Sequence, residues 1–182
     1  MKIPLSGRKK ALLLVDIQEI FLKPRNRYIL ANIQRLLKSV PYDLYFEALF
    51  WAPNNSIWSK QLNWTSPKRD SKPEQMISKL LKTKKTVYFQ KNTKSAFKGN
   101  FSILKTLNKN KIKEVHIVGL DTNDCVLATA YEAFDFGFYT YVIEECVESS
   151  GGLSIHKHGL ATLRHVNLTN KSLAKKQNFL SV

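Results

Sequence analysis

The stretch that decides the fold runs from residue 115 to residue 130, Val-His-Ile-Val-Gly-Leu-Asp-Thr-Asn-Asp-Cys-Val-Leu-Ala-Thr-Ala. Its apolar beginning predicts a strand that ends at Gly119, and after a short polar turn a helical pattern begins at Cys125. The Cys125 thiol is therefore expected at a helix N-terminus, beyond the carboxyl end of a strand. Unpaired N–H groups and the helix dipole favour a thiolate in such a position, which makes Cys125 a candidate nucleophile.

Short apolar runs alternate with helical patterns along the rest of the chain. Strands are expected at residues 11–15, 44–50, 86–90, 115–118 and 139–143, with a short sixth at 166–168. Helices are expected at residues 29–37, 73–81, 101–107, 125–136 and 153–165, with a short helix or ordered loop at 56–64. This alternation predicts an α/β fold, a three-layer, doubly wound, mainly parallel sheet of about six strands with helices on both faces. We expect a single domain over residues 1–182, with basic extensions at about 1–9 and 170–182.

Composition and charge narrow the class of protein. The apolar fraction of 43% indicates a packed globule, and no apolar run approaches a membrane span. The N-terminus does not resemble a signal peptide, so we expect a cytoplasmic protein whose two cysteines, Cys125 and Cys146, are reduced. The net charge of +15 comes largely from lysine clusters at expected helix ends and loops, which favours a solvated surface over a specific nucleic-acid site. The sequence leaves open whether the chain forms homo-oligomers.

Three reactive residue types fall at the carboxyl ends of three expected strands, where open α/β sheets bind their ligands. Asp16 follows the first strand, Lys91 the third, and Cys125 the fourth. Taken singly, the three residues have ordinary interpretations as a turn residue, a surface lysine and a small buried side chain. Their coincidence at three strand ends favours a shared site.

Three motifs resemble the signatures of the isochorismatase-like cysteine hydrolases, a superfamily that includes nicotinamidases and N-carbamoyl amide hydrolases. They are Val15-Asp16-Ile17-Gln18, Lys91-x-x-Lys94-Ser95-Ala96-Phe97 and Gly119-Leu120-Asp121-Thr122-x-x-Cys125-Val126-x-x-Thr129-Ala130. The resemblance runs from about residue 10 to residue 163 and implies a catalytic triad of Asp16, Lys91 and Cys125. It also implies a cis peptide just before Asp121 and an oxyanion hole formed by the backbone N–H groups of Asp121 and Cys125. Lys91 would stabilise the thiolate, and Asp16 would accept the thiol proton and return it to the leaving amine.

The chain departs from the nicotinamidase pattern where those enzymes hold a metal. After the second strand it reads Phe50-Trp51-Ala52-Pro53-Asn54-Asn55, without an Asp-x-His pair, and the first histidine of the chain is His116. We therefore expect no metal site and no cofactor. The later histidines His156 and His158 are expected at the surface or as helix caps, and Thr122 as a cap or turn residue. Lys94 stands where relatives often have an aromatic residue, which predicts a more cationic pocket.

The leading hypothesis is a metal-independent cysteine hydrolase that cleaves the C–N bond of a small amide or carbamoyl compound through a thioester. The candidate pocket residues are Phe21, Phe50, Trp51 and Phe97, with Trp64 as a further candidate and Trp58 expected to serve packing instead. Two alternatives remain: a basic binding or scaffold protein on the same fold without turnover, and a Cys–His peptidase that uses His156 or His158.

Overall fold

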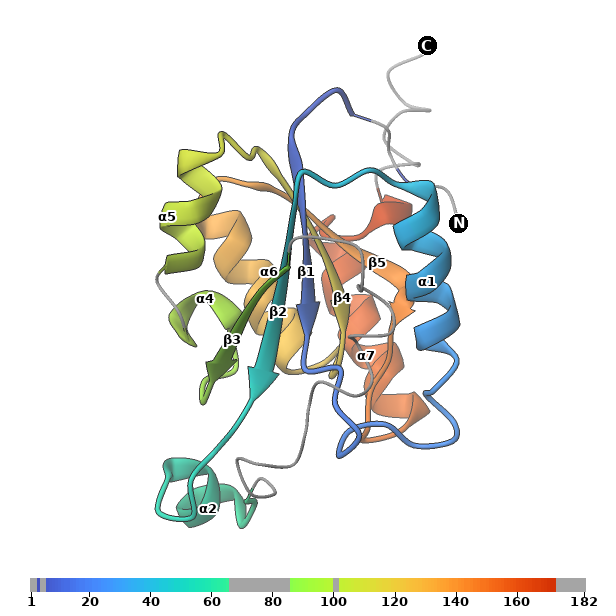
Figure 1. Ribbon diagram of the computed structural model, residues 1–182. Helices are drawn as coiled ribbons and strands as arrows, with labels where there is room; N and C mark the ends of the chain where they lie inside the picture. The colour runs from blue at the N-terminus through green and yellow to red at the C-terminus, as the bar shows by residue number, and fades with distance from the viewer. Residues whose placement is uncertain (1–2, 4–5, 66–85, 100–101, 173–182) are drawn as a thin grey trace.

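The computed structural model describes residues 3, 6–65, 86–99 and 102–172. Within these residues, five parallel strands form one sheet in the order β3-β2-β1-β4-β5, and all of their arrows point the same way in Figure 1. The strands are β1 (Lys10–Val15), β2 (Leu44–Phe50), β3 (Thr86–Lys91), β4 (Glu114–Gly119) and β5 (Tyr139–Val147). The chain adds β2 and β3 on one side of β1, then returns to add β4 and β5 on the other. The strand order therefore reverses between β1 and β4, which is where such sheets bind ligands.

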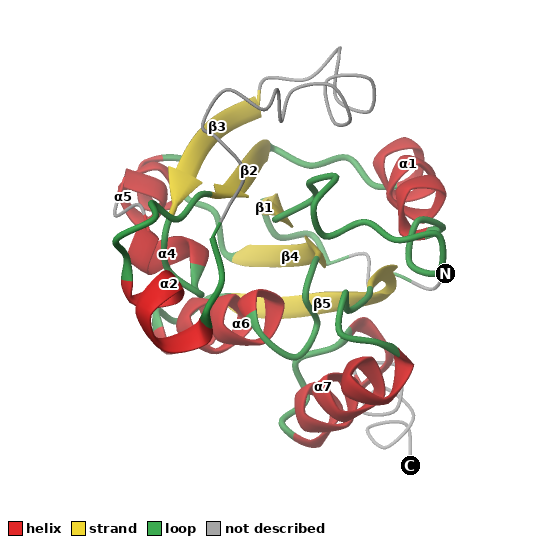
Figure 2. Ribbon diagram, turned by 90° about the horizontal axis from the view of Figure 1, so that it is seen from below, coloured by secondary structure: helices red, strands yellow, loops and turns green. Residues whose placement is uncertain are grey.

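Helices cover both faces of the sheet, as Figure 2 shows from below. They are α1 (Ile29–Ser39), α2 (Ile57–Leu62), α4 (Ala96–Gly99), α5 (Ser102–Lys109), α6 (Cys125–Asp135) and α7 (Leu153–His165). All six residues of β1 are buried, as expected for a continuous apolar strand covered on both sides. The doubly wound α/β architecture expected from the sequence is confirmed.

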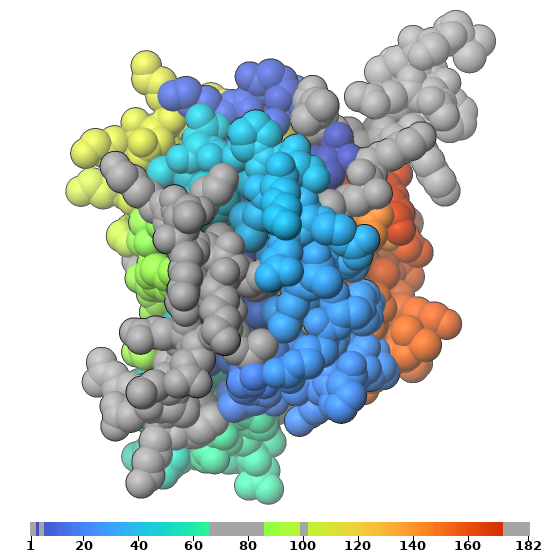
Figure 3. Space-filling view, turned by 45° about the vertical axis from the view of Figure 1, so that its right-hand side comes forward, coloured from blue at the N-terminus to red at the C-terminus, as the bar shows by residue number. Residues whose placement is uncertain are grey.

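Two hydrophobic clusters flank the sheet. On one face, α1 buries Ile29, Ile33, Leu36 and Leu37, which recur with helical spacing, against side chains from β1, β4 and β5. Figure 3 looks obliquely at this side of the molecule, where α1 and the loop before it form the blue surface. On the other face, α4, α5 and α6 pack against the sheet through side chains such as Phe97, Ile103 and Val126.

The expected sixth strand at 166–168 is wrong. After α7 the chain turns, with Asn167 at a φ of 59°, and only one isolated bridge joins Val142 of β5 to Thr169. A strand needs several consecutive pairs, and the tight turn leaves room for one. In the other direction, β5 continues to Val147, four residues beyond its expected end. The helix expected at 73–81 lies outside the described residues.

None of the helices in the described part of the chain is long and apolar enough to span a membrane.

Candidate active site

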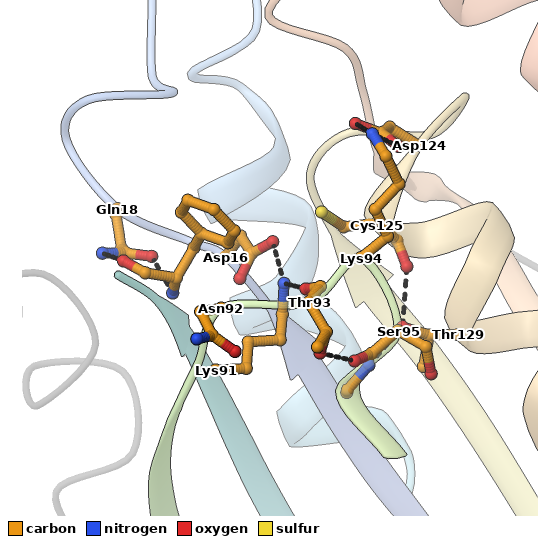
Figure 4. A network of polar contacts seen from close by, with 12 residues as sticks. Asp16, Gln18, Lys91, Asn92, Thr93, Lys94, Ser95, Asp124, Cys125 and Thr129 are labelled. Atoms are coloured by element: carbon orange, nitrogen blue, oxygen red, sulfur yellow. Dashed lines mark hydrogen bonds and ion pairs between the residues drawn. The ribbon is translucent and has the colours of Figure 1, made fainter. Parts of the chain in front are cut away.

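Three separate elements bring Asp16, Lys91 and Cys125 together at the carboxyl edge of the sheet. Asp16 directly follows β1, Lys91 is the last residue of β3, and Cys125 is the first residue of α6. Lys91 Nζ lies 2.7 Å from Asp16 Oδ2, and both side chains are buried. Figure 4 shows the Cys125 sulfur facing this ion pair. The structure thus places the three sequence-predicted residues in one site.

The two oxygens of the Asp16 carboxylate have different surroundings. Oδ2 accepts the hydrogen bond from Lys91, whereas the buried Oδ1 has no hydrogen-bond partner within the residues described. A buried carboxylate oxygen without a donor is costly, because it has given up its hydration. Asp16 also has a φ of 51°, a left-handed conformation that non-glycine residues rarely adopt and that concentrates at functional sites. Both features favour a chemical role for Asp16.

Lys91 is held in place by three contacts. Besides Asp16, its ammonium donates to the Thr93 carbonyl at 3.0 Å and lies 5.0 Å from the centre of the Phe50 ring. Burial disfavours this charge, but the Asp16 carboxylate and Cys125 outweigh that effect, so the pKa of Lys91 is raised. Lys91 therefore keeps its proton, and its role is that of a fixed positive charge.

The protonation state of Cys125 differs from the expected thiolate. The pKa of the Cys125 thiol is raised well above its usual value, first by burial and second by the negative charge of Asp16, while Lys91 opposes the rise. Burial also raises the pKa of Asp16, with Lys91 again opposing. Because the Lys91 charge is already matched by Asp16, little of it remains to stabilise a thiolate. Cys125 rests as a neutral thiol beside a carboxylate that can take its proton.

The turn between β4 and Cys125 leaves two backbone donors free. The peptide bond between Leu120 and Asp121 is cis, as the family resemblance implied. Neither the Asp121 N–H nor the Cys125 N–H donates a hydrogen bond to any residue that the structure describes. Such unpaired N–H groups beside a nucleophile are the elements of an oxyanion hole.

Gly119 fixes how this turn leaves the sheet. Its φ is 119°, and a Cβ atom at this position would lie 2.0 Å from the Val15 carbonyl oxygen of β1. Only glycine fits here, because any side chain would overlap the neighbouring strand. The close approach of β4 to β1 thus sets Cys125 beside Asp16.

A cavity of about 400 Å³ opens in front of Cys125. One side is apolar and aromatic, and the other presents polar groups and the nucleophile. Its described lining consists of Asp16, Ile20, Phe21, Lys23, Phe50, Trp58, Leu62, Trp64, Asp121, Asp124, Cys125 and Ser150. The volume suits a small molecule with a flat apolar part.

The aromatic wall is only partly the one expected. Phe21 and Phe50 line the cavity, with Trp64 stacked on Phe21 at 5.9 Å and Trp58 edge-on to Phe50 at 4.5 Å. Trp58, for which a packing role was expected, packs on Phe50 and also lines the cavity, because α2, which carries it, lies beyond the ends of β2 and β3.

Two expected wall residues lie elsewhere. Phe97 is buried on α4, where its ring packs against Phe136 at 5.5 Å and Phe138 at 6.3 Å, so it belongs to the core under α6. Trp51 is not among the described residues that line the cavity. Because Phe50 ends β2 with its ring toward the cavity, the alternation of side chains along the strand sends the next residue the other way.

Two further side chains shape the site through hydrogen bonds that the sequence alone does not reveal. The Gln18 side-chain amide pairs with the backbone of Phe50, donating at 3.1 Å and accepting at 2.6 Å, and so ties the loop after β1 to the aromatic wall. Thr129 Oγ1 donates to the Cys125 carbonyl at 2.6 Å and accepts from the Ala96 N–H at 3.1 Å, which joins α6 to α4. Both belong to the quoted motifs, but only the fold shows what they hold.

Lys94 does not make the pocket more cationic. Its ammonium binds both oxygens of Asp124, at 2.5 and 2.6 Å, and lies 4.8 Å from the Trp58 ring centre. The ion pair neutralises the charge and links the loop after β3 to the residue just before α6.

The histidines lie away from the cavity. His116 is buried in β4 between Tyr42 and Glu114, with hydrogen bonds of 2.9 Å to each. His156 was expected at the surface or as a cap, which is wrong: it is buried and lies 2.9 Å from Thr122 Oγ1. Thr122 was expected to be a cap or a turn residue. It belongs to the turn before α6, and its side chain does not cap that helix.

The donor set for a metal is missing from the described residues, which contain no cluster of three or more histidine, cysteine or acidic side chains able to hold one. Each of the three carboxylates that line the cavity already has a partner, Asp16 in Lys91, Asp121 in Ser150 and Asp124 in Lys94. Within the described part of the chain, the residues therefore do not fit a metal. The second cysteine, Cys146, is buried and lies within β5 rather than beyond its end.

The chain is similar to known proteins in sequence profile and in fold. The sequence profile of the isochorismatase domain matches residues 10–173. No curated protein sequence matches the chain significantly. Similar solved structures include PnC1 from L. infantum in complex with nicotinate, the pyrazinamidase/nicotinamidase of Streptococcus mutans, and the N-carbamoylsarcosine amidase of Thermoplasma acidophilum.

Sequence identity to these structures is low and their coverage is high. PnC1 is 18% identical with a TM-score of 0.74, and 93% of this chain and 95% of that one are covered. The Streptococcus enzyme is 20% identical with a TM-score of 0.73, over 88% of this chain and 99% of that one. The Thermoplasma enzyme is 19% identical with a TM-score of 0.68, over 82% and 90%. The profile match over most of the sequence shows that the chain belongs to the isochorismatase-like hydrolase superfamily.

Proposed function

We propose that this protein is a metal-independent cysteine hydrolase that cleaves the C–N bond of a small amide or carbamoyl compound. The observation that carries the proposal is that the two carboxylate oxygens of Asp16 have different surroundings. Oδ2 is held by Lys91 at 2.7 Å, whereas the buried Oδ1 accepts no such hydrogen bond, and the Cys125 thiol lies close enough to this carboxylate to interact with it. Both Asp16 and the Cys125 thiol line the same cavity.

The first half of the reaction follows from these positions. The Cys125 sulfur attacks the substrate carbonyl carbon while its proton passes to Asp16, so that a C–S bond forms as the C=O double bond becomes a C–O⁻ single bond. The free N–H groups of Asp121 and Cys125 stabilise this oxyanion. As the tetrahedral intermediate collapses, the C–N bond breaks and Asp16 gives the proton to the leaving nitrogen.

The second half regenerates the thiol. A water molecule attacks the thioester and gives one proton to Asp16, the same oxyanion forms, and the C–S bond breaks. The sulfur takes the proton back from Asp16, and the carboxylic or carbamic acid leaves. Lys91 stays protonated throughout and keeps Asp16 oriented.

A neutral resting thiol suits this cycle. Proton transfer to Asp16 places a negative charge on sulfur only when a carbonyl carbon is there to accept it. The raised pKa of Cys125 also protects the thiol from alkylation and oxidation between turnovers, because the thiolate is the reactive form.

The substrate class is supported by the cavity and by the neighbours. A volume of about 400 Å³ and an aromatic wall suit a small, flat molecule. The similar structures are described as nicotinamidases and as an amidase of a carbamoyl compound, which supports amide or carbamoyl chemistry here. A Cys–His peptidase finds no support, because no histidine lies among the described residues of the cavity lining.

The test is a screen of primary amides and carbamoyl compounds, read by ammonia release, with Cys125→Ala beside the wild type. We expect turnover by the wild type and none by the variant, whose fold, measured by circular dichroism, should be intact because little volume is lost. Cys125→Ser is the matched control for the loss of the polar group. Turnover by Cys125→Ala at the wild-type rate would contradict the covalent mechanism, and inactivity of the wild type on every compound would favour a scaffold role.

A further inference from the structure

The turn that carries the oxyanion-hole donors is held from behind by residues 148–150, which follow β5. Three successive residues of the turn each have a partner in this segment. The bonds are Ser150 N to Asp121 Oδ1 (2.7 Å), Ser150 Oγ to Asp121 Oδ2 (2.6 Å), Thr122 N to the Glu148 carbonyl (3.0 Å), and Ser149 Oγ to Asn123 Oδ1 (2.7 Å). This pairing fixes the course of the backbone just before Cys125.

Helix α7 closes the same turn from another side. A Cβ atom at Gly159 would lie 2.8 Å from both the Cα and the N atom of Asn123, and 3.0 Å from the Thr122 carbonyl carbon. Real Cβ atoms essentially never come so close to backbone, so only glycine permits this packing. The turn therefore rests directly on the backbone of α7.

His156 is the side chain through which α7 reaches the turn. Its Nδ1 lies 2.9 Å from Thr122 Oγ1 and 3.3 Å from Glu148 Oε1. Glu148 is buried and is paired in turn with Arg25, 2.6 Å from Nη1 to Oε2. A polar chain thus runs from Arg25 through Glu148 and His156 to Thr122, next to the donor Asp121.

The residues of this chain of contacts lie outside the cavity lining. Among the described residues, neither Arg25, Glu148, His156 nor Thr122 lines the cavity. A network of four polar groups, three of them buried, is costly unless every member is satisfied, so its location behind the nucleophile calls for a reason.

We propose that His156 is a positioning residue: by fixing Thr122, it holds the N–H groups of Asp121 and Cys125 so that both point to the same site in the cavity. The role rests on the proposed function, because it serves the oxyanion of that reaction. Preorganised donors stabilise an oxyanion only when their geometry is set in advance, and small displacements cost large factors in rate.

The test compares two reactions of the same thiol. Hydrolysis forms an oxyanion, whereas alkylation of Cys125 by iodoacetamide does not. His156→Phe keeps a ring but loses the hydrogen bond, and Thr122→Val removes the partner hydroxyl. We expect each to lower kcat for an amide found in the screen by about 10- to 100-fold, with KM and the alkylation rate within about twofold of the wild type.

Further variants separate positioning from general damage. His156→Asn places an amide near the position of Nδ1 and should restore most of the lost kcat. The double variant His156→Phe/Thr122→Val should be no slower than either single variant, because both remove one contact. His158→Phe is the matched control, since His158 is exposed on the same helix two residues later. It should behave as the wild type.

Two outcomes would overturn the proposal. One is an unchanged kcat in His156→Phe. The other is alkylation slowed as much as hydrolysis, because that would indicate a general loss of the site. Inactivity of the wild type on every amide would instead refute the proposed function, and benzaldehyde would then serve as the probe. Its carbonyl carbon bonds to the Cys125 sulfur and its oxygen takes the thiol proton, giving a hemithioacetal whose hydroxyl oxygen accepts hydrogen bonds from the same donors. Benzaldehyde should protect wild-type Cys125 from iodoacetamide at lower concentrations than it protects His156→Phe. Equal protection, or none in either protein, would contradict the role of His156.

Discussion

Glu47 in β2 is a buried carboxyl group that the proposed reaction does not use, and replacing it with glutamine should change how stability depends on pH. The residue is 1% exposed, its Oε2 has no hydrogen-bond partner in the described part of the chain, and burial raises its pKa from 4.5 to about 8. In the unfolded chain the carboxyl group returns to its ordinary value. Between the two pKa values the folded protein binds the proton more tightly than the unfolded chain, so wild-type stability falls as the pH rises.

The size of this effect follows from the difference between the two pKa values. At about 1.36 kcal/mol for each pKa unit, the full effect is about 5 kcal/mol, reached above pH 8 and absent below pH 4.5. Glu47→Gln keeps the shape and cannot ionise. Relative to the wild type, it should therefore gain about 3.5 kcal/mol of unfolding free energy between pH 5 and pH 8.

Urea unfolding of both proteins at pH 5, 6, 7 and 8 measures this difference. Glu19→Gln is the control, because Glu19 is exposed and pairs with Arg27 at the surface. A difference between the Glu47→Gln variant and the wild type that stays constant over this range would refute the argument, since it would show that Glu47 titrates alike in the folded and unfolded states.

Two further predictions concern the active site. Asp16 raises and Lys91 lowers the pKa of Cys125, so Asp16→Asn should move the onset of iodoacetamide alkylation to lower pH and Lys91→Met to higher pH. Shifts in the same direction would show that the two charges do not act separately on the thiol. Asp16→Asn and Lys91→Ala should each lower amide turnover by about 100-fold or more. Activity should survive exhaustive dialysis against EDTA or phenanthroline, because the described residues offer no donor set for a metal; loss of activity that zinc, iron or manganese restores would contradict a metal-independent reaction.

The sequence predicted the site because parallel strands end at a common edge. Asp16, Lys91 and Cys125 follow three strands whose positions are evident from apolar runs, and any parallel sheet of these strands brings their ends to one side. The protonation state of Cys125 was beyond the sequence, since it depends first on how deeply the thiol is buried and then on the balance between the charges of Asp16 and Lys91. These contributions to the pKa depend on three-dimensional positions, which only the structure provides.

Side-chain direction accounts for the remaining errors. Phe97 and Phe50 are both aromatic residues near a strand end, and nothing in their neighbours distinguishes a core ring on α4 from a wall ring at the end of β2. His156 and His158 lie two residues apart on α7 and so on different faces, and which face meets the protein depends on how α7 packs. Gly159 lets α7 pack directly on the turn before Cys125, and His156 is the histidine that faces this turn.

The pairing of β1 with β4, from Lys10 with Glu114 to Val15 with Gly119, has a consequence during protein synthesis. The ribosome makes β1 first, yet one edge of this apolar strand stays without its partner until β4 emerges about a hundred residues later. At about 5–20 residues per second, that delay lasts roughly 5–20 s. An unpaired apolar edge is prone to aggregate, and the high positive charge of the chain opposes such association between nascent copies. Cys125 follows β4 by only a few residues, so every nascent fragment that carries this thiol already contains β1, β2, β3 and β4.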